Sequence, residues 1–398
     1  MTMLPIEHRP TAELAAQLQE LATTGLTRRR RVLESPCGRL ATVDGKKVLN
    51  FASNDYLGLA SNRDIAQAMA DGALQWGAGS GASHLVSGHL APHEKLEQEI
   101  AAFTDFPRAL TFSTGYLANL AVTPTLAAAY GRGAAVFADK LNHASLIDAM
   151  QLAKANGADV QRYPHNDMAA LGKMLAACSA ACKIIVTDAV FSMDGDLAPL
   201  PLLHALAERY DAWLVIDDAH GFGVLGAQGK GCLAHFNLPV SSRILLMGTL
   251  GKAAGVGGAF VAGSETAIEY LLQKSRSYIF TTAAPPAVAC ALVKSLEIIR
   301  HGDALRASLF ARIGQLRDGL AGLPWQLLPS PTAIQPLIVG DNEAALKLAN
   351  ALWERGLWVP AIRPPTVPKG TARLRISVSA AHSEADIASL IGALKELA

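Results

Sequence analysis

The chain has 398 residues, of which 51% are hydrophobic and 17% charged, and its formal net charge is +1. This length exceeds the usual size of one hydrophobic core, so we expect two or more structural lobes. The near-neutral charge argues against a nucleic-acid or membrane-surface partner, and no apolar run approaches the ~20 residues of a membrane span.

Cysteine usage and the N-terminus predict where the protein works. Five scattered cysteines, an odd number without framework spacing, indicate a reducing compartment rather than a disulfide scaffold. Cys178 and Cys182 lie one helical turn apart, but no further Cys or His pair completes a zinc set, so we expect no metal. The N-terminus lacks the basic and apolar regions of a signal peptide. We therefore expect a cytoplasmic protein.

The first predicted element is an amphipathic helix over residues 11–24, in which Leu14, Leu18 and Leu21 share one face. A run of four arginines follows it, at Arg28–Arg31. Such a run is usually a solvated face, although one of its arginines can instead hold an anionic substrate.

From about residue 64 to 265, helix-like stretches separate short β-rich runs. This alternation predicts an α/β fold with a mainly parallel sheet covered by helices on both faces. The expected strands are 109–112, 135–138, 184–187, 214–216, 244–247 and 259–262. In open sheets of this kind, ligands bind beyond the carboxyl ends of the strands.

After about residue 290 the pattern changes to that of a smaller α+β lobe. We expect a long helix, β-rich runs at 333–339, 357–362 and 373–378, and helices over 343–355 and from 383 onward. The predicted organisation is an N-terminal helix and segment (1–63), a large cofactor-binding domain (64–290) and a small C-terminal domain (291–398).

Two strand-end segments carry the strongest chemical signal. Lys252 lies in a loop of small residues after the apolar run 244–247, and the strand 213–216 ends at Asp217, followed closely by His220. A Schiff-base lysine, a carboxylate for a pyridinium nitrogen and a nearby histidine are the protein groups that pyridoxal phosphate needs. Burial would lower the pKa of Lys252 toward the range useful for imine formation and proton transfer.

Further residues near strand ends suit the remaining parts of this cofactor. Thr249 can donate its hydroxyl to a phosphate, and Gly115 and Tyr116 offer backbone N–H groups at the start of a helix. His143 can stack on a flat ring. Ser192 also falls just after a strand candidate.

Two glycine-rich segments imitate a dinucleotide-binding fingerprint. Gly77–Ala82 follows a helical stretch where a strand is required, and Gly221–Gly226 does not open a helix. We therefore reject both as nucleotide sites. A nucleotide-dependent oxidoreductase remains the more distant alternative.

Taken together, several segments resemble the α-oxoamine synthases, a family of pyridoxal-phosphate enzymes. The matching segments, in chain order, are 50–59, 77–89, 139–145, 190–196, 217–223 and 248–252. The resemblance implies a PLP-dependent transferase type I fold, with a mainly parallel sheet flanked by helices in a large domain and a smaller α+β C-terminal domain. It also implies a homodimer whose active site lies at the interface.

The resemblance implies roles for individual residues around the cofactor ring. Lys252 would bind the cofactor covalently, Asp217 would hold the ring nitrogen and His143 would stack on the ring. Ser192 and His220 would contact the phenolic oxygen.

The same resemblance implies a phosphate site shared between two subunits. Thr249 and the backbone of Gly115 and Tyr116 would hold the phosphate within one subunit. Thr281 and Thr282 would reach the phosphate region of the neighbouring subunit.

The remaining matched positions concern the substrates and one departure from the family. Arg28, Asn54 and Thr366 match substrate-binding positions, and Arg363 matches a carboxylate-binding arginine. Asp188 stands at a cofactor-binding position where the family usually has Glu, so a shorter acid would hold the adjoining contacts.

Two C-terminal segments narrow the expected reaction. Residues 333–342 and 362–368 resemble the branch of the family that condenses L-alanine with a pimeloyl thioester in biotin biosynthesis, with loss of CO₂. Whether CoA or a carrier protein carries the acyl group stays open. The nearer alternative is another α-oxoamine synthase, such as a glycine C-acetyltransferase.

Overall fold

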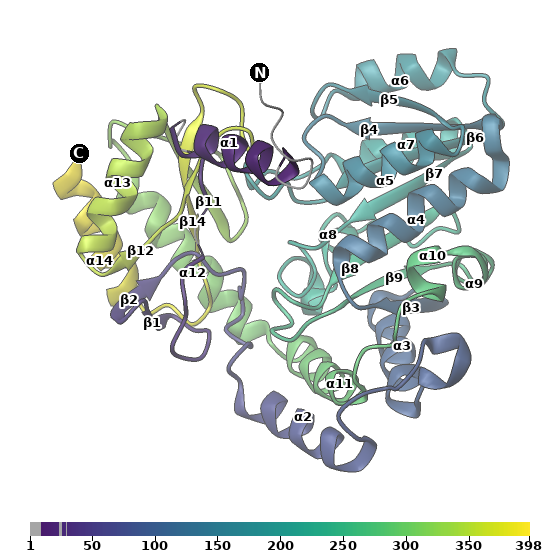
Figure 1. Cartoon of the computed structure of the whole chain (residues 1–398), viewed down its shortest axis with the longest axis horizontal. Coiled ribbons are helices and arrows are strands. Elements are labelled where there is room, and N and C mark those ends of the chain that lie inside the picture. The colour runs from purple at the N-terminus through teal and green to yellow at the C-terminus, as the bar shows by residue number, and fades with distance from the viewer. Residues whose placement is uncertain (1–8, 24–25, 29) are drawn as a thin grey trace.

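A computed structural model describes residues 9–23, 26–28 and 30–398, which form a large and a small lobe (Figure 1). The large lobe holds one broad sheet covered by helices, and the C-terminal part of the chain forms the small lobe. None of the helices described is both long and apolar enough to cross a membrane.

The sheet of the large lobe has seven strands within the described residues, in the order β3-β9-β8-β7-β6-β4-β5. β9 runs antiparallel to both of its neighbours, and the other pairs are parallel. The strands are β3 (Arg108–Phe112), β4 (Ala134–Asp139), β5 (Asp159–Tyr163), β6 (Cys182–Asp188), β7 (Ala212–Asp217), β8 (Ile244–Thr249) and β9 (Ala259–Gly263). This confirms the predicted mainly parallel α/β fold.

Helices cover both faces of this sheet because its strands are apolar on both sides. In β4, Val136 and Ala138 pack into one buried cluster, whereas Ala135 and Phe137 pack into the other. The helices of the large lobe are α2 (Arg63–Trp76), α3 (Ala91–Thr104), α4 (Gly115–Tyr130), α5 (Ala144–Ala155), α6 (Met168–Ala177), α7 (Leu200–Arg209), α8 (Cys232–His235), α9 (Glu265–Lys274), α10 (Arg276–Ile279) and α11 (Pro286–Arg300).

The small lobe packs helices on a second, antiparallel sheet with strand order β10-β11-β14-β13. Its elements are α12 (Asp303–Leu320), β10 (Gln326–Leu327), β11 (Ile334–Gly340), α13 (Asn342–Glu354), β13 (Ala361–Ile362), β14 (Ala372–Ser377) and α14 (Glu384–Leu397). The predicted α+β C-terminal lobe is therefore present. The boundaries predicted for the three regions stay predictions, and position 290 falls within α11.

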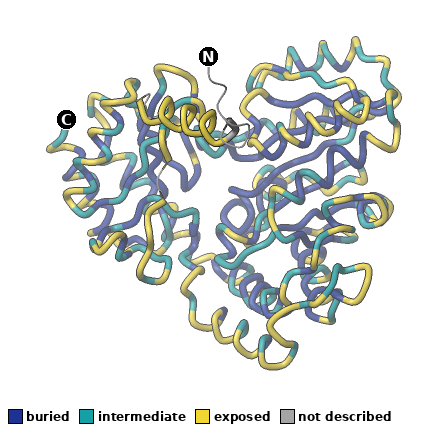
Figure 2. Tube along the Cα trace, viewed as in Figure 1, coloured by how far each residue is buried: buried dark blue, intermediate teal, exposed yellow. Residues whose placement is uncertain are grey.

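The N-terminal segment lies beside this small lobe. β1 (Leu40–Val43) and β2 (Lys46–Asn50) form a hairpin, and β2 pairs in parallel with β12 (Leu357–Trp358). α1 (Arg9–Thr23) lies over the gap between the two lobes in Figure 1, and its residues 11–23 are exposed in Figure 2. The predicted helix end at residue 24 lies outside the described residues.

Several details of the strands differ from the prediction. β5 is a polar edge strand, so it lacks the apolar run by which its neighbours are identified. The hairpin of β1 and β2 was also not predicted. The run 357–362 is two short strands in different sheets, because Pro360 has no N–H with which to continue a ladder.

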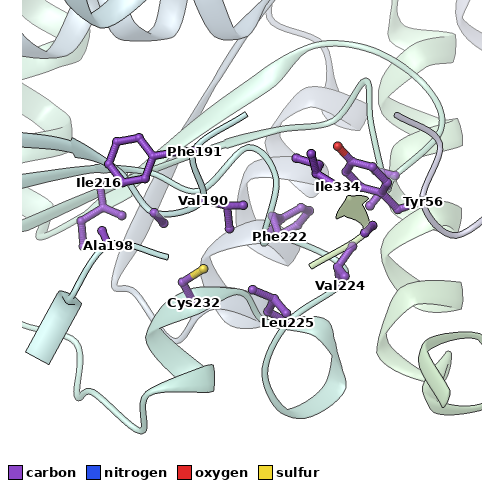
Figure 3. Packing of buried hydrophobic residues seen from close by; sticks show 14 of the residues in the cluster. Tyr56, Val190, Phe191, Ala198, Ile216, Phe222, Val224, Leu225, Cys232 and Ile334 are labelled. Atoms are coloured by element: carbon purple, nitrogen blue, oxygen red, sulfur yellow. The ribbon is translucent and has the colours of Figure 1, made fainter. Parts of the chain in front are cut away.

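One apolar core is shared by the two lobes where they meet. Figure 3 shows Phe222 and Val224, from the loop after β7, close to Ile334 of the small lobe. Tyr56 of the N-terminal segment belongs to the same buried cluster. This continuous packing fixes the loop after β7 relative to the small lobe.

Candidate active site

A cavity of about 600 Å³ lies at the carboxyl ends of the parallel strands, with walls from both lobes. Six residues predicted for the site line it: Asn54, His143, Ser192, His220, Lys252 and Thr366. Further wall residues are Leu141, Ile147, Pro360, Ile362, Pro365 and Arg375. The fold thus collects residues from distant parts of the sequence where ligands bind in open parallel sheets.

Lys252 begins a short chain of hydrogen bonds in this cavity. Its Nζ is 2.9 Å from Nε2 of His220, whose Nδ1 is 2.7 Å from the hydroxyl of Tyr56. The Tyr56 hydroxyl donates to Oδ1 of Asn54 at 3.1 Å. Because that hydroxyl has a single proton, Nδ1 of His220 is the donor to Tyr56. Nε2 of His220 is then an acceptor that faces the lysine.

Burial tunes both members of the Lys252–His220 pair toward their neutral forms. It lowers the pKa of Lys252 from its ordinary 10.5 to about 8, although the carboxylates of Asp217 and Asp188 oppose the change. Burial also lowers the pKa of His220 well below its usual range, and the positive charge of Lys252 adds to this effect. Near neutral pH the pair can therefore accept and release a proton at Nζ.

Two carboxyl groups lie side by side beneath the cavity. Asp188 and Asp217 end β6 and β7 in register, and both are buried. Asp217 accepts hydrogen bonds from the backbone N–H of Ala219 at 3.0 Å and from the amide of Asn119 at 2.7 Å. Asp188 accepts from the backbone N–H of His143 at 2.7 Å. Burial, reinforced by Asp217, raises the pKa of Asp188 well above its usual range.

His143 is the residue that precedes α5 and caps its first turn. Its Nδ1 accepts the backbone N–H of Ser145 at 3.2 Å and lies 2.7 Å from the Ser145 hydroxyl. Burial lowers the pKa of His143, although Asp217 opposes this shift. A neutral imidazole therefore borders the cavity, as the predicted ring-stacking role requires.

The backbone at the start of α4 is arranged so that it could hold an anion. Thr114 caps the helix and accepts the N–H of Leu117 at 3.2 Å, which leaves the N–H groups of Gly115 and Tyr116 at the helix N-terminus. A Cβ added to Gly115 would lie 3.9 Å from Oγ1 of Thr249. The three predicted phosphate contacts are thus neighbours. A lysine amine, a buried carboxylate and an anion site together fit pyridoxal phosphate.

Arg28, Arg363, Thr281 and Thr282 are also not among the residues that line the cavity of a single chain. Arg28 is exposed, and Arg363 lies in the loop that carries Thr366. Thr281 donates to the carbonyl oxygen of Ser277 at 2.7 Å. Thr282 lines a separate cavity of about 360 Å³. The partner-subunit role of the two threonines stays a prediction.

The sequence prediction missed three residues of the site. Arg375 and Tyr56 are buried beside Asn54, and Asn119 contacts Asp217. Of the three, only Arg375 could have been found from the sequence. It lies within an apolar strand, where a buried arginine costs free energy unless it has a partner. In the described part of the chain, its hydrogen bonds go to a carbonyl, an amide and a hydroxyl oxygen, with no carboxylate among them.

A histidine cluster lies apart from this cavity. His84, His89 and His93 can place one ring nitrogen each within 4.8 Å of one another. However, Nδ1 of His93 accepts the backbone N–H of Leu90 at 3.0 Å, and Nε2 lies 2.8 Å from the carbonyl oxygen of Ala284. Both ring nitrogens of His93 therefore contact the backbone, which favours a structural role for the cluster over metal binding. The absence of a metal from the reaction stays a prediction.

The amino-acid sequence matches a known protein family and curated relatives over nearly its whole length. A family model described as aminotransferase class I and II matches residues 46–394. The 8-amino-7-oxononanoate synthase of Dechloromonas aromatica (strain RCB) is 84% identical over 385 residues, which cover 97% of this chain and 99% of that protein.

Solved structures agree with this match. A serine palmitoyltransferase variant from S. paucimobilis, with an adduct of pyridoxal phosphate and myriocin bound, superposes with a TM-score of 0.89 at 30% identity and covers 98% of this chain and 97% of its own. The 8-amino-7-oxononanoate synthase from Francisella tularensis gives a TM-score of 0.74 at 30% identity, covering 88% of this chain and 98% of its own.

Proposed function

The chain belongs to the 8-amino-7-oxononanoate synthases, within the class I and II aminotransferases, and we propose that its inter-lobe cavity is where the family's reaction takes place. The chain is a pyridoxal-phosphate-dependent acyltransferase of biotin biosynthesis. We propose L-alanine and a pimeloyl thioester as its substrates. The hydrogen-bonded Lys252–His220 pair in a cavity between the two lobes is the observation that supports placing the reaction there.

The residues of the large lobe hold the cofactor in this proposal. When bound, pyridoxal phosphate withdraws electrons from the α-carbon of an amino acid. Lys252 would attach it, Asp217 would hold its ring nitrogen and His143 would stack on the ring. Thr249 and the first N–H groups of α4 would hold the phosphate. Ser192 and His220 would contact the phenolic oxygen.

Lys252 moves the substrate proton in this proposal. Its Nζ, with a pKa of about 8, takes the α-proton of L-alanine and later returns a proton to the product carbon. His220 accepts a hydrogen bond from Nζ through Nε2 and so holds the amine in place. Tyr56 fixes the ring of His220 from the opposite side.

Arg375 is proposed to bind the carboxylate of L-alanine. Its side chain lines the cavity, is 5% exposed and carries a charge with no carboxylate partner among the described residues. A guanidinium recognises a carboxylate with strong, directional hydrogen bonds. Asn54, which accepts from Arg375 at 3.2 Å, holds the guanidinium in the wall.

The apolar part of the wall suits the acyl chain. Leu141, Ile147, Ile362 and Pro365 line the cavity, and Thr366, which follows Pro365 in sequence, lines it as well. In the reaction, the α-carbon of alanine forms a bond to the thioester carbonyl and the thiolate leaves. The alanine carboxylate then leaves as CO₂. We propose CoA as the thiol carrier, with Arg28 as an anionic contact and Arg363 as a further carboxylate-binding residue, as the family resemblance implies.

The assembly and compartment are also proposals. We propose a homodimer in which Thr281 and Thr282 complete the partner's phosphate site, because these threonines lie outside their own chain's catalytic cavity. We propose that the protein works in the cytoplasm, since its five cysteines are all free thiols.

A substrate panel tests the proposed reaction. The purified protein with pyridoxal phosphate is given L-alanine, glycine or L-serine, each with pimeloyl-CoA, acetyl-CoA or palmitoyl-CoA, and products are identified by mass. Only alanine with pimeloyl-CoA is expected to give 8-amino-7-oxononanoate at a high rate. Preferred turnover of glycine with acetyl-CoA would instead support a glycine C-acetyltransferase.

A further inference from the structure

The side-chain amide of Asn119 links two parts of the active site that lie on different elements. Asn119 lies in the second turn of α4 and is 1% exposed. Its Nδ2 is 2.7 Å from Oδ2 of Asp217 and 2.8 Å from Oγ of Ser145. Oδ2 of Asp217 accepts this hydrogen bond, so Nδ2 rather than Oδ1 of the amide faces it. Both N–H groups of the amide are therefore engaged.

Ser145 extends this contact to His143. Because Oγ of Ser145 accepts a hydrogen bond from Asn119, its own proton can be donated to Nδ1 of His143, 2.7 Å away. The backbone N–H of Ser145 donates to the same nitrogen. Nδ1 is thus an acceptor, and the proton of the neutral His143 ring lies on Nε2.

The other polar atom of the amide, Oδ1, argues against a role for Asn119 in packing alone. Its Oδ1 is buried and has no hydrogen-bond partner within the described residues. An unsatisfied buried carbonyl oxygen costs free energy that an apolar residue of similar size would avoid. The two donated hydrogen bonds are therefore what an asparagine supplies at this position.

We propose that Asn119 is a positioning residue that holds Asp217 and, through Ser145, His143 in the relative geometry that the cofactor ring requires. This inference rests on the proposed cofactor contacts of Asp217 and His143, and not on which amino acid or thioester reacts. Because one amide orients both groups, its loss should disturb the positions of both Asp217 and His143 and so weaken cofactor binding.

Cofactor binding by full-length variants tests this proposal. Asn119→Asp keeps the size of the side chain but places an acceptor where Asp217 and Ser145 need a donor. Ser145→Ala removes the hydroxyl that links Asn119 to His143 but leaves the contact between Asn119 and Asp217. Thr123→Ala is the matched control, because Thr123 is equally buried one turn further along α4 and its hydroxyl has no hydrogen-bond partner within the described residues. The apoprotein of each is titrated with pyridoxal phosphate, without substrates, and its thermal unfolding is recorded.

We expect the dissociation constant of the cofactor to rise by about tenfold or more in Asn119→Asp, less in Ser145→Ala and at most about twofold in Thr123→Ala. ¹⁵N NMR of histidine-labelled apoprotein should show the Nε2-protonated form of His143 in the parent, and a changed signal in Ser145→Ala. A parent-like dissociation constant in folded Asn119→Asp would overturn the proposal. An equal rise in Thr123→Ala would overturn it as well. Should Asn119→Asp fail to fold, a parent-like His143 signal in Ser145→Ala would overturn it.

Each of these outcomes is independent of the proposed substrates. If the substrate panel fails while the dissociation constants follow this order, the positioning role of Asn119 stands and the assigned reaction falls. The reverse pattern would retain the reaction and remove the role of Asn119.

Discussion

At the scale of single residues, burial decides which groups of the cavity can act as acids and bases. Lys252 and His220 face each other across 2.9 Å, and desolvation favours the neutral form of each. His220 gives both of its ring nitrogens to fixed neighbours, so it orients the amine of Lys252. A lysine with a pKa of about 8 is a nucleophile near neutral pH, whereas an exposed lysine is almost fully charged there.

The pH dependence of cofactor attachment follows from this shift. Only the free amine of Lys252 can attack the cofactor aldehyde, so attachment to the apoprotein should accelerate as pH rises, with a midpoint near pH 8. Stopped-flow absorbance between pH 6 and 10 measures this rate. Lys252→Ala should lack the attachment phase and product formation while keeping its fold, whereas the exposed Lys294→Ala should behave like the parent. A midpoint near the ordinary 10.5 would show that burial does not tune the lysine.

Arg375 gives a second prediction at this scale. Arg375→Met keeps much of the packing but removes the charge, so the KM for L-alanine should rise about 30- to 100-fold, with a much smaller change in the KM for pimeloyl-CoA. Steady-state kinetics with one substrate varied at a time measure both values. Arg317→Met is the control, because Arg317 is a part-buried arginine of the small lobe that bonds to Gln335 and nearby carbonyl oxygens. An unchanged KM for L-alanine in Arg375→Met would rule out the carboxylate role.

At the scale of elements, the strands position the functional side chains at their carboxyl ends, and the N-terminus of a helix offers N–H groups to an anion. The sequence identified most strands of the large sheet, because a strand buried on both faces reads as a short apolar run. It therefore located Asp217 and Thr249 at strand ends. It could not identify β5, which is polar, nor pair Arg375 and Asn119 with their neighbours, because those contacts join residues far apart in the chain.

The cap of α4 gives a prediction for one element. Thr114→Ala should lower the free energy of unfolding by about 1 kcal/mol and also weaken cofactor binding by about threefold, since the cap fixes the first N–H groups of the helix. Ser264→Ala removes the equivalent cap of α9 and should lower stability similarly, with no effect on the cofactor. Urea unfolding and cofactor titration measure the two effects. If both variants weakened cofactor binding equally, α4 would have no special part in the phosphate site.

At the scale of the whole molecule, the site depends on how the small lobe meets the large one. Arg373 of β14 donates at 2.6 Å to Asp194, in the loop after β6, and also to the carbonyl oxygen of Met193 at 3.1 Å. The side chain of Arg373 is only 4% exposed. This contact anchors the wall that carries Arg375 to the loop that carries Ser192. Sequence analysis predicted two lobes but not this connection, since ion-pair partners so distant in sequence leave no local pattern.

Removing the carboxylate of this ion pair should destabilise the junction of the lobes. Asp194→Ala leaves a buried guanidinium without its counter-charge, so the free energy of unfolding should fall by about 3 kcal/mol. Glu384→Ala breaks a pair with Arg312 within the small lobe in which the carboxylate is 79% exposed, and should cost less than about 1 kcal/mol. Chemical unfolding of both variants provides the comparison. Similar small losses in the two would mean that the Arg373–Asp194 pair does not hold the lobes together.

The most direct test of the central claim follows the carboxyl carbon of alanine. L-alanine labelled with ¹³C at its carboxyl group is mixed with pimeloyl-CoA, pyridoxal phosphate and the protein, with Lys252→Ala in parallel. We predict labelled CO₂ in equal amount to free CoA, an unlabelled 8-amino-7-oxononanoate, and neither product from the variant. Label retained in the condensation product, or CO₂ released without pimeloyl-CoA, would contradict a decarboxylative condensation in this cavity.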